Sequence, residues 1–121
     1  MITPKKIVKE PVVMRLDRKP FDEMKAGKKV WEIRINGDKW NGVRAGDSIP
    51  VMRRPELEEK IMVTVVERQT FLNVQRLLDH IPLHELGQFA TELDFIQTIM
   101  NHYTPKSMND YGLVAMKVKV I

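Results

Sequence analysis

The sequence has 121 residues, enough to bury one hydrophobic core without the help of disulfides or a metal. It contains no cysteine, which excludes a disulfide framework and thiolate chemistry and is typical of a cytoplasmic protein. A net charge of +4 permits a partner that carries phosphate groups, although a soluble surface with a small excess of lysine explains it more simply. No stretch approaches the ~20 apolar residues of a membrane-spanning helix, so no membrane partner is predicted.

The chain is predicted to consist of a basic extension, residues 1–10, and a single domain, residues 11–121. The extension carries lysines but no apolar run, so it does not resemble a secretory signal. Pro11 precedes a first strand over Val12–Leu16. A short helix comes next, with Pro20 in its first turn, where the missing N–H is harmless.

Glycine and proline mark the limits of the next elements. Gly27 ends the helix as a C-terminal cap, and a second strand is predicted from about Lys29 to Ile35. A third strand is expected over Ile49–Met52, where Pro50 indicates an edge strand or a bulge. The stretch Pro55–Glu59 is predicted to form a hairpin loop.

The second half of the chain begins with a strand and continues with helices. The run Ile61–Val66 is almost entirely apolar, which predicts a central strand buried on both faces. Helical periods cover Val74–Ile81 and a second segment that begins at the N-cap Thr91. The apolar face of this second helix is expected to be formed by Leu93, Ile96, Met100 and Tyr103. After a turn at Asn109-Asp110, a last strand alternates over Val114–Val120.

These elements define the fold class. Helices do not alternate regularly with strands, which argues against a doubly wound parallel sheet. About five strands and three helices predict an α+β fold, built as a small mixed or antiparallel β-barrel with flanking helices.

The second predicted strand carries three charges that strand formation does not require. Lys29 lies at its beginning, and Glu32 and Arg34 are two residues apart and therefore share one face. Trp31 and Ile33 take the opposite face. Such charges cost free energy unless they meet each other, water or a ligand. They are either a ligand-binding group or an ion pair that contributes little to stability.

Two tryptophans lie among basic residues, a combination that suits single-stranded nucleic acid because bases stack on rings and phosphates meet cations. Trp31 is more simply a core residue. Trp40 lies in a polar loop, where its ring either folds back on the core or is presented to a ligand. The basic neighbours are Lys28, Lys29, Arg34, Lys39 and Arg44.

His80 and His84 are four residues apart, the spacing of two metal ligands on one helix. Pro82 lies between them, and the sequence offers no evident third ligand. The chain also lacks a phosphate-binding glycine fingerprint and a serine in a nucleophile elbow. No metal site and no cofactor are therefore predicted.

A helix ending in Gly-x-Lys, a strand bearing Glu-x-Arg and a Gly-Asp turn succeed one another in this sequence. They are formed by Gly27, Lys29, Glu32, Arg34, Gly46 and Asp47. Their order and spacing resemble the ASCH domain family, a branch of the PUA-like superfamily, and the resemblance extends roughly from Val12 to Val120. It implies a small PUA-like β-barrel with flanking helices and a cleft beside the barrel that holds the motif residues.

The resemblance also implies that the cleft binds RNA or a nucleotide-like ligand. Lys29 and Arg34 would meet a phosphate or carbonyl oxygen, and Glu32 would accept a hydrogen bond from a base or sugar or hold Arg34 in place. Lys28 and Trp40 complete the predicted binding residues, with the ring of Trp40 stacking on a base.

Some members of the family are hydrolases, so an enzyme acting on RNA or on a modified nucleoside is the alternative. Glu32 would then be the general base, and Lys29 would stabilise the developing charge. The amidohydrolases of the family use a threonine nucleophile where this chain has Glu32, and a carboxylate cannot replace that hydroxyl. A third alternative is an interaction module whose motif only braces the barrel. A second copy of the chain is a candidate partner through an open sheet edge.

Overall fold

The computed structural model describes residues 12–121, so the predicted basic extension lies outside the described residues. The strands are β1 (Met14–Leu16), β2 (Trp31–Ile35), β3 (Ser48–Arg53), β4 (Lys60–Phe71) and β5 (Leu113–Val120). The helices are α1 (Arg18–Lys25), α2 (Val74–His80), α3 (Leu83–Leu86), α4 (Glu92–His102) and α5 (Pro105–Tyr111). None of these helices is both long and apolar enough to span a bilayer.

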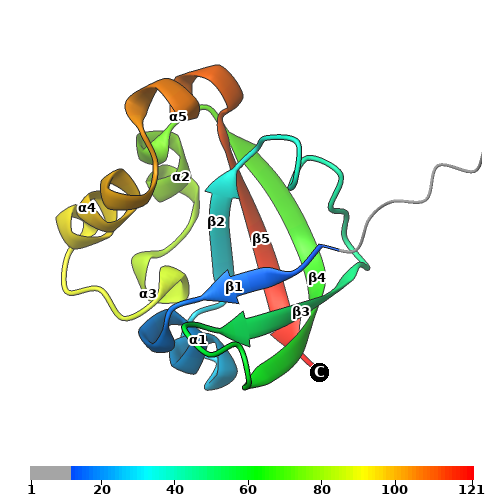
Figure 1. The fold of residues 1–121 in the computed structure, drawn as a ribbon. Helices are drawn as coiled ribbons and strands as arrows, with labels where there is room; N and C mark the ends of the chain where they lie inside the picture. The colour runs from blue at the N-terminus through cyan, green and yellow to red at the C-terminus, as the bar shows by residue number, and fades with distance from the viewer. Residues whose placement is uncertain (1–11) are drawn as a thin grey trace, which may run out of the picture.

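The strands form one sheet in the order β1-β3-β4-β5-β2. Strand β1 pairs with β3 in parallel, and every other pair is antiparallel, which makes the sheet mixed. The sheet curls so that β1 and β3 lie in front of the other strands, while β1 and β2 remain as its two edges (Figure 1). The result is a half-barrel with helices, which confirms the predicted α+β fold built on a small mixed barrel.

One hydrophobic core fills the inside of the half-barrel. Alternate residues of β5 (Val114, Met116 and Val118) point into it, as the two-residue period of a strand requires. Helix α1 closes it with Phe21 and Met24, both almost fully buried. The loop between β2 and β3 covers it with Trp40 and Val43.

A second core lies on the other face of the sheet. Leu113 and Ala115 of β5 and Trp31 and Ile33 of β2 point to this side. Helices α2 to α5 gather there, on the side of β2 (Figure 1). Their buried side chains are Leu77, Leu86, Phe95, Ile99 and Met108. Strands β2 and β5 are therefore covered on both faces over most of their length.

Two strand predictions need correction. Strand β3 lies between β1 and β4 and is therefore not an edge strand. Its pairing with β1 begins only at Val51, so Pro50 has no β1 residue opposite it, and the absence of its backbone N–H costs no hydrogen bond to β1. The predicted central strand is longer than expected, and it is not buried on both faces, because Ile61 and Met62 are half-buried. A bulge in the pairing of β4 with β5 leaves Val66 exposed.

The helices also differ from the prediction at two places. Helix α4 starts at the predicted cap, since the Thr91 hydroxyl accepts the backbone N–H of Asp94. However, it buries Phe95 and Ile99, whereas Leu93 and Met100, expected on the inner face, are exposed. The residues expected to form a turn at Asn109-Asp110 belong to helix α5. Gly27, by contrast, ends α1 as predicted, with a left-handed φ of 76°.

Candidate binding cleft

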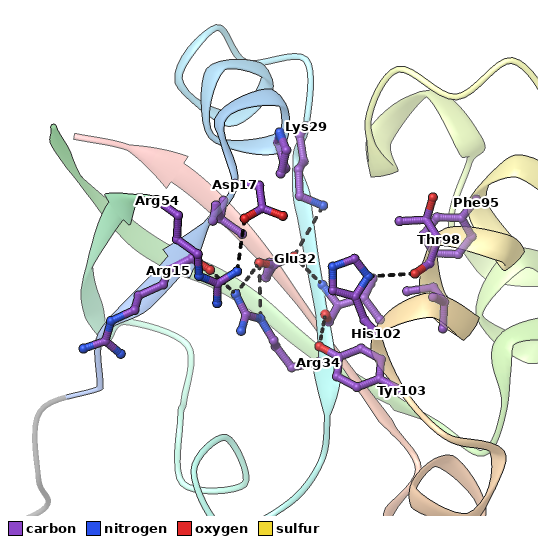
Figure 2. A pocket seen from close by; sticks show the side chains of 14 residues that line it. Arg15, Asp17, Lys29, Glu32, Arg34, Arg54, Phe95, Thr98, His102 and Tyr103 are labelled. Carbon is purple, nitrogen blue, oxygen red and sulfur yellow. Dashed lines mark hydrogen bonds and ion pairs between the residues drawn. The ribbon is translucent and has the colours of Figure 1, made fainter. Parts of the chain in front are cut away.

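A narrow cleft runs along the free edge of β2, between β1 with the start of α1 on one side and α4 on the other (Figure 2). Its volume is about 130 Å³. Its polar lining residues are Arg15, Asp17, Lys29, Glu32, Arg34, Arg54, Thr98, His102 and Tyr103. Its apolar lining residues are Leu16, Pro20, Ile33, Phe95 and Ile99. The structure thus brings the three motif charges together in one cleft.

Glu32 is the centre of the charged group, and only 5% of its surface is exposed. One carboxylate oxygen accepts the backbone N–H of Ile33 at 3.0 Å and lies 3.4 Å from Lys29 Nζ. The other oxygen accepts hydrogen bonds from Nε of Arg34 at 3.3 Å and from its Nη2 at 3.0 Å. Both oxygens are therefore engaged with protein groups.

Lys29 is also buried, like Glu32, with 8% of its surface exposed. Its ammonium donates hydrogen bonds to the carbonyl of Trp31 at 2.8 Å and to that of Leu86 at 3.1 Å. Glu32 is its third neighbour. Because an ammonium has three donors, these partners account for all of them, and Lys29 fastens β2 to the end of α3.

Arg34 connects the motif to the opposite wall of the cleft. Its Nη2 donates a hydrogen bond to the backbone carbonyl of Arg15 at 3.1 Å, in addition to the contacts with Glu32. Its guanidinium lies 4.9 Å from the ring centre of Trp40, and Lys39 Nζ lies 5.1 Å from the same ring. Trp40 is 6% exposed and belongs to the inner core. The loop therefore folds this ring back on the core, and a base would have to displace Arg34 or Lys39 to stack on it.

Burial and charge act in opposite directions on these groups. Burial disfavours the ionised carboxylate of Glu32, but Lys29, Arg34 and the hydrogen bonds outweigh it and hold the pKa of Glu32 below its usual range. Burial also disfavours the charged form of Arg34, yet Glu32 keeps the pKa of that guanidinium above its usual value. Glu32 and Arg34 are therefore both ionised at neutral pH.

The same side chains close the free edge of β2. The backbone carbonyl of Val30 accepts a hydrogen bond from the backbone N–H of Val118 on β5. In an antiparallel pair, alternate residues of a strand bond to the neighbouring strand, so the backbone N–H and carbonyl groups of Trp31 and Ile33 point away from β5. Lys29 binds the carbonyl of Trp31, Glu32 binds the N–H of Ile33, and the Tyr103 hydroxyl donates to the carbonyl of Ile33 at 3.4 Å. Burial raises the pKa of Tyr103, which keeps its hydroxyl protonated and able to donate. The motif therefore protects this edge from pairing.

The outer part of the cleft carries cations that the motif does not neutralise. Arg54 lies 3.4 Å from Asp17, and the side chain of Arg15 makes no hydrogen bond or ion pair within residues 12–121. Burial and the like charges of Arg34, Arg15 and Arg54 lower the pKa of Lys39, a sign that positive charge accumulates here. Among residues 12–121, four cations and two carboxylates line the cleft, an excess of two positive charges.

The cleft continues outward into a second, open hollow. Both hollows share Arg15, Asp17 and Arg54, and the outer one is also lined by Arg18, Pro55 and Leu57. A third hollow, around α1, shares Arg18 with the outer one and contains Lys28. Of the predicted binding residues, Lys28 is therefore separated from the cleft that holds Lys29, Glu32 and Arg34.

Several cleft residues were missed in the sequence, namely Arg15, Asp17, Arg54, Thr98 and His102. Arg15 had a signal, because it alternates with the buried Met14 and Leu16 of β1. Arg54 and His102 had none, since only the curl of the sheet and the packing of α4 bring them to β2.

Of the two histidines considered for metal binding, His80 ends α2 and His84 lies on the separate helix α3. Residues 12–121 contain no group of three potential metal ligands.

The fold is an ASCH-like half-barrel, as comparison with solved structures shows. The hypothetical protein PH0355 is similar with a TM-score of 0.79 and 20% identity, over 92% of this chain and 99% of that one. Protein PF0455 from Pyrococcus furiosus is similar with a TM-score of 0.72 and 18% identity, over 92% and 97% of the two chains.

The ASCH protein of Zymomonas mobilis, solved as a point mutant, is similar with a TM-score of 0.64 and 12% identity, over 93% of this chain and 76% of that one. At such identities the likeness concerns the fold, and it confirms the ASCH-like architecture expected from the motif. No family model matches the sequence, and no curated protein matches it at a significant level.

Proposed function

We propose that this protein is an ASCH-domain protein whose cleft binds RNA or a related nucleotide through its phosphate groups. The observation that carries this proposal is the excess of positive charge at the outer end of the cleft. Lys29 and Arg34 are matched by Glu32, whereas among residues 12–121 Arg54 is paired with Asp17 and the side chain of Arg15 has no charged partner. Guanidinium groups suit phosphate because their planar donors meet two oxygens at once.

The size of the cleft supports a strand more than a compact small molecule. Its volume of about 130 Å³ is well below the roughly 300–1,000 Å³ of pockets that enclose a drug-sized ligand. It accommodates one group, such as a phosphate or part of a nucleotide. The rest of the ligand would lie in the outer hollow, along Arg15, Arg18 and Arg54.

The contacts of Glu32 favour binding over hydrolysis. A general base must be free to take a proton, and it works best when its pKa is near the working pH. Both oxygens of Glu32 are engaged, and its pKa is lowered. Glu32 and Lys29 are better suited to holding Arg34 and the edge of β2 in place than to acid–base chemistry.

The cellular location and the oligomeric state remain predictions that accompany this proposed function. A cytoplasmic location would give the protein access to RNA and nucleotides. A homodimer formed through the edge of β2 would require Lys29, Glu32 and Tyr103 to release backbone groups that they now bind. We therefore expect the chain to bind its ligand as a monomer, or as a dimer built on another surface.

The test is titration of a fluorescently labelled single-stranded RNA at low salt, measured by anisotropy. The variant Arg15→Ala/Arg54→Ala removes the two outer cations without touching the buried motif, and Arg76→Ala, on α2 outside the cleft, is the matched control. We expect the double variant to bind about 10-fold more weakly or worse, and Arg76→Ala to bind like the parent. Equal affinity of the parent and the double variant, or no binding by the parent, would overturn the proposal.

A further inference from the structure

His102 is a cleft residue that the proposed contacts do not use. It is the last residue of α4, it is exposed, and it lines the cleft with Lys29 and Glu32. Figure 2 shows one nitrogen of its imidazole bonded to Thr98 and the other directed toward the side where Lys29 and Glu32 lie.

The bond to Thr98 fixes which nitrogen carries the hydrogen. Nδ1 of His102 lies 2.8 Å from the backbone carbonyl of Thr98. A carbonyl can only accept, so in the neutral ring Nδ1 is the donor and Nε2 is left as an acceptor. This Nε2 has no hydrogen-bond partner among the residues that the structure describes.

An acceptor without a partner stands out in this cleft because most of its polar groups are donors. Arg15, Arg34 and Arg54 carry only donors. The hydroxyls of Thr98 and Tyr103 donate to backbone carbonyls.

Among residues 12–121, the cleft has two carboxylates besides these donors. Glu32 is engaged on both oxygens, and Asp17 is paired with Arg54 at the outer end. The cleft therefore fits a ligand that brings anionic oxygens and also one hydrogen-bond donor to the side of α4.

We propose that His102 accepts a hydrogen bond from the ribose 2′-hydroxyl of the bound strand and thereby makes the cleft selective for RNA over DNA. This inference rests on the proposed function. The 2′-hydroxyl is the donor that an RNA strand has and a DNA strand of the same bases lacks. The arginines cannot make the distinction, since the phosphates of both strands are alike.

The experiment compares three short labelled single strands of one sequence of adenine and cytosine. One is RNA, one is DNA, and one is RNA with 2′-fluoro in place of the hydroxyl, which keeps the sugar shape and removes the donor. The parent, His102→Phe and His102→Gln are titrated with each, beside His84→Phe as a control on α3 away from the cleft. Thermal unfolding verifies that all variants are folded.

We expect the parent to bind RNA about 3- to 10-fold more tightly than the other two strands, as fits one neutral hydrogen bond. His102→Phe should bind all three strands alike, His102→Gln should keep part of the preference through its amide oxygen, and His84→Phe should match the parent. Equal binding of RNA and DNA by the parent, or an undiminished preference in His102→Phe, would overturn the role of His102 and leave the proposed function intact. Binding of none of the strands would overturn the proposed function itself.

Discussion

Glu32 holds two cations in a place where little water reaches them. Replacing it with Gln keeps the shape of the side chain but leaves Lys29 and Arg34 without a counterion. Breaking a buried ion pair by removing one partner costs about 3–5 kcal/mol, because the remaining charge stays buried. We expect the free energy of unfolding of Glu32→Gln, measured by urea titration, to fall by an amount in this range.

The control for this prediction is Glu67→Gln. Glu67 is exposed on β4, opposite Lys117 of β5. An exposed carboxylate contributes little, so the control should change the free energy of unfolding by less than about 0.5 kcal/mol. If Glu32→Gln and Glu67→Gln proved equally stable, the ion pairs of Glu32 with Lys29 and Arg34 would not stabilise the fold as their contacts indicate.

The lowered pKa of Glu32 also predicts how stability depends on pH. Burial opposes ionisation, but Lys29 and Arg34 prevail, so the folded pKa lies below the unfolded value of about 4.3. The contribution of Glu32 is therefore complete above that pH and disappears as the pH falls through the folded pKa. The difference in unfolding free energy between the parent and Glu32→Gln should be constant from neutral pH down to about 5 and narrow below 4. A constant difference throughout the acid range would contradict this.

At the residue scale, the sequence predicts contacts that local geometry determines and misses those that depend on distant packing. The two-residue period of a strand places Glu32 and Arg34 on one face, and the structure pairs them there. Nothing local places Arg54 beside Asp17, because the two meet only through the pairing of β1 with β3. Trp40 shows the same limit: its ring lies in a polar loop, and it is buried only because it packs against the core inside the half-barrel.

Among the elements, α4 decides the shape of the cleft, since the wall that contains Thr98, His102 and Tyr103 is formed by this helix and its C-cap. Its N-cap is Thr91, whose hydroxyl accepts the N–H of Asp94 at 3.2 Å. Thr91→Ala removes this bond and should lower the free energy of unfolding by about 1 kcal/mol. Amide exchange measured along the chain should accelerate first at the start of α4.

The variant Thr91→Ser serves as the control for the cap, because it keeps the hydroxyl and changes only the methyl group. It should stay within about 0.5 kcal/mol of the parent. An equal loss of stability in the Ser and Ala variants would mean that the methyl group, and not the cap, stabilises this end of α4.

The existence of α4 was predictable, but its orientation was not. Two apolar stripes run along it, one through Leu93 and Met100 and one through Phe95 and Ile99, and both have helical spacing. The second stripe is the buried one because Phe95 and Ile99 pack in the core that covers the outer face of the sheet. Helix α5 was missed because it is short and mostly polar, although Thr104 caps it and Pro105 occupies its first position.

At the scale of the whole molecule, the cleft exists because the sheet does not close. A complete barrel would pair its two edges, whereas here β1 and β2 remain apart within the described sheet, with Arg34 bridging to the backbone of Arg15. Side chains of the motif bind the backbone N–H and carbonyl groups at the edge of β2. No further strand is needed there, so the space beside β2 is open to a ligand. The same residues thus stabilise an incomplete barrel and line the site that the gap creates.

A path of cations along this gap predicts how RNA binding depends on salt. Arg15 and Arg54 line both the cleft and the outer hollow, and Arg18 extends the path along the start of α1. If these three arginines neutralise three phosphates, the logarithm of the association constant should fall with the logarithm of the salt concentration with a slope of about −2, at roughly −0.7 per phosphate on a single strand. Anisotropy titrations over a salt series measure this slope directly.

The variant Arg18→Ala isolates the outer part of the path. It should reduce the steepness of the slope by about 0.7, and Arg76→Ala, which removes the same charge from α2, should leave the slope unchanged. A ligand held in the inner cleft alone would give the parent and Arg18→Ala the same slope, which would exclude the outer hollow from the binding surface. A slope near zero in the parent would mean that phosphate contacts do not drive binding, because neutralised phosphates must release counterions.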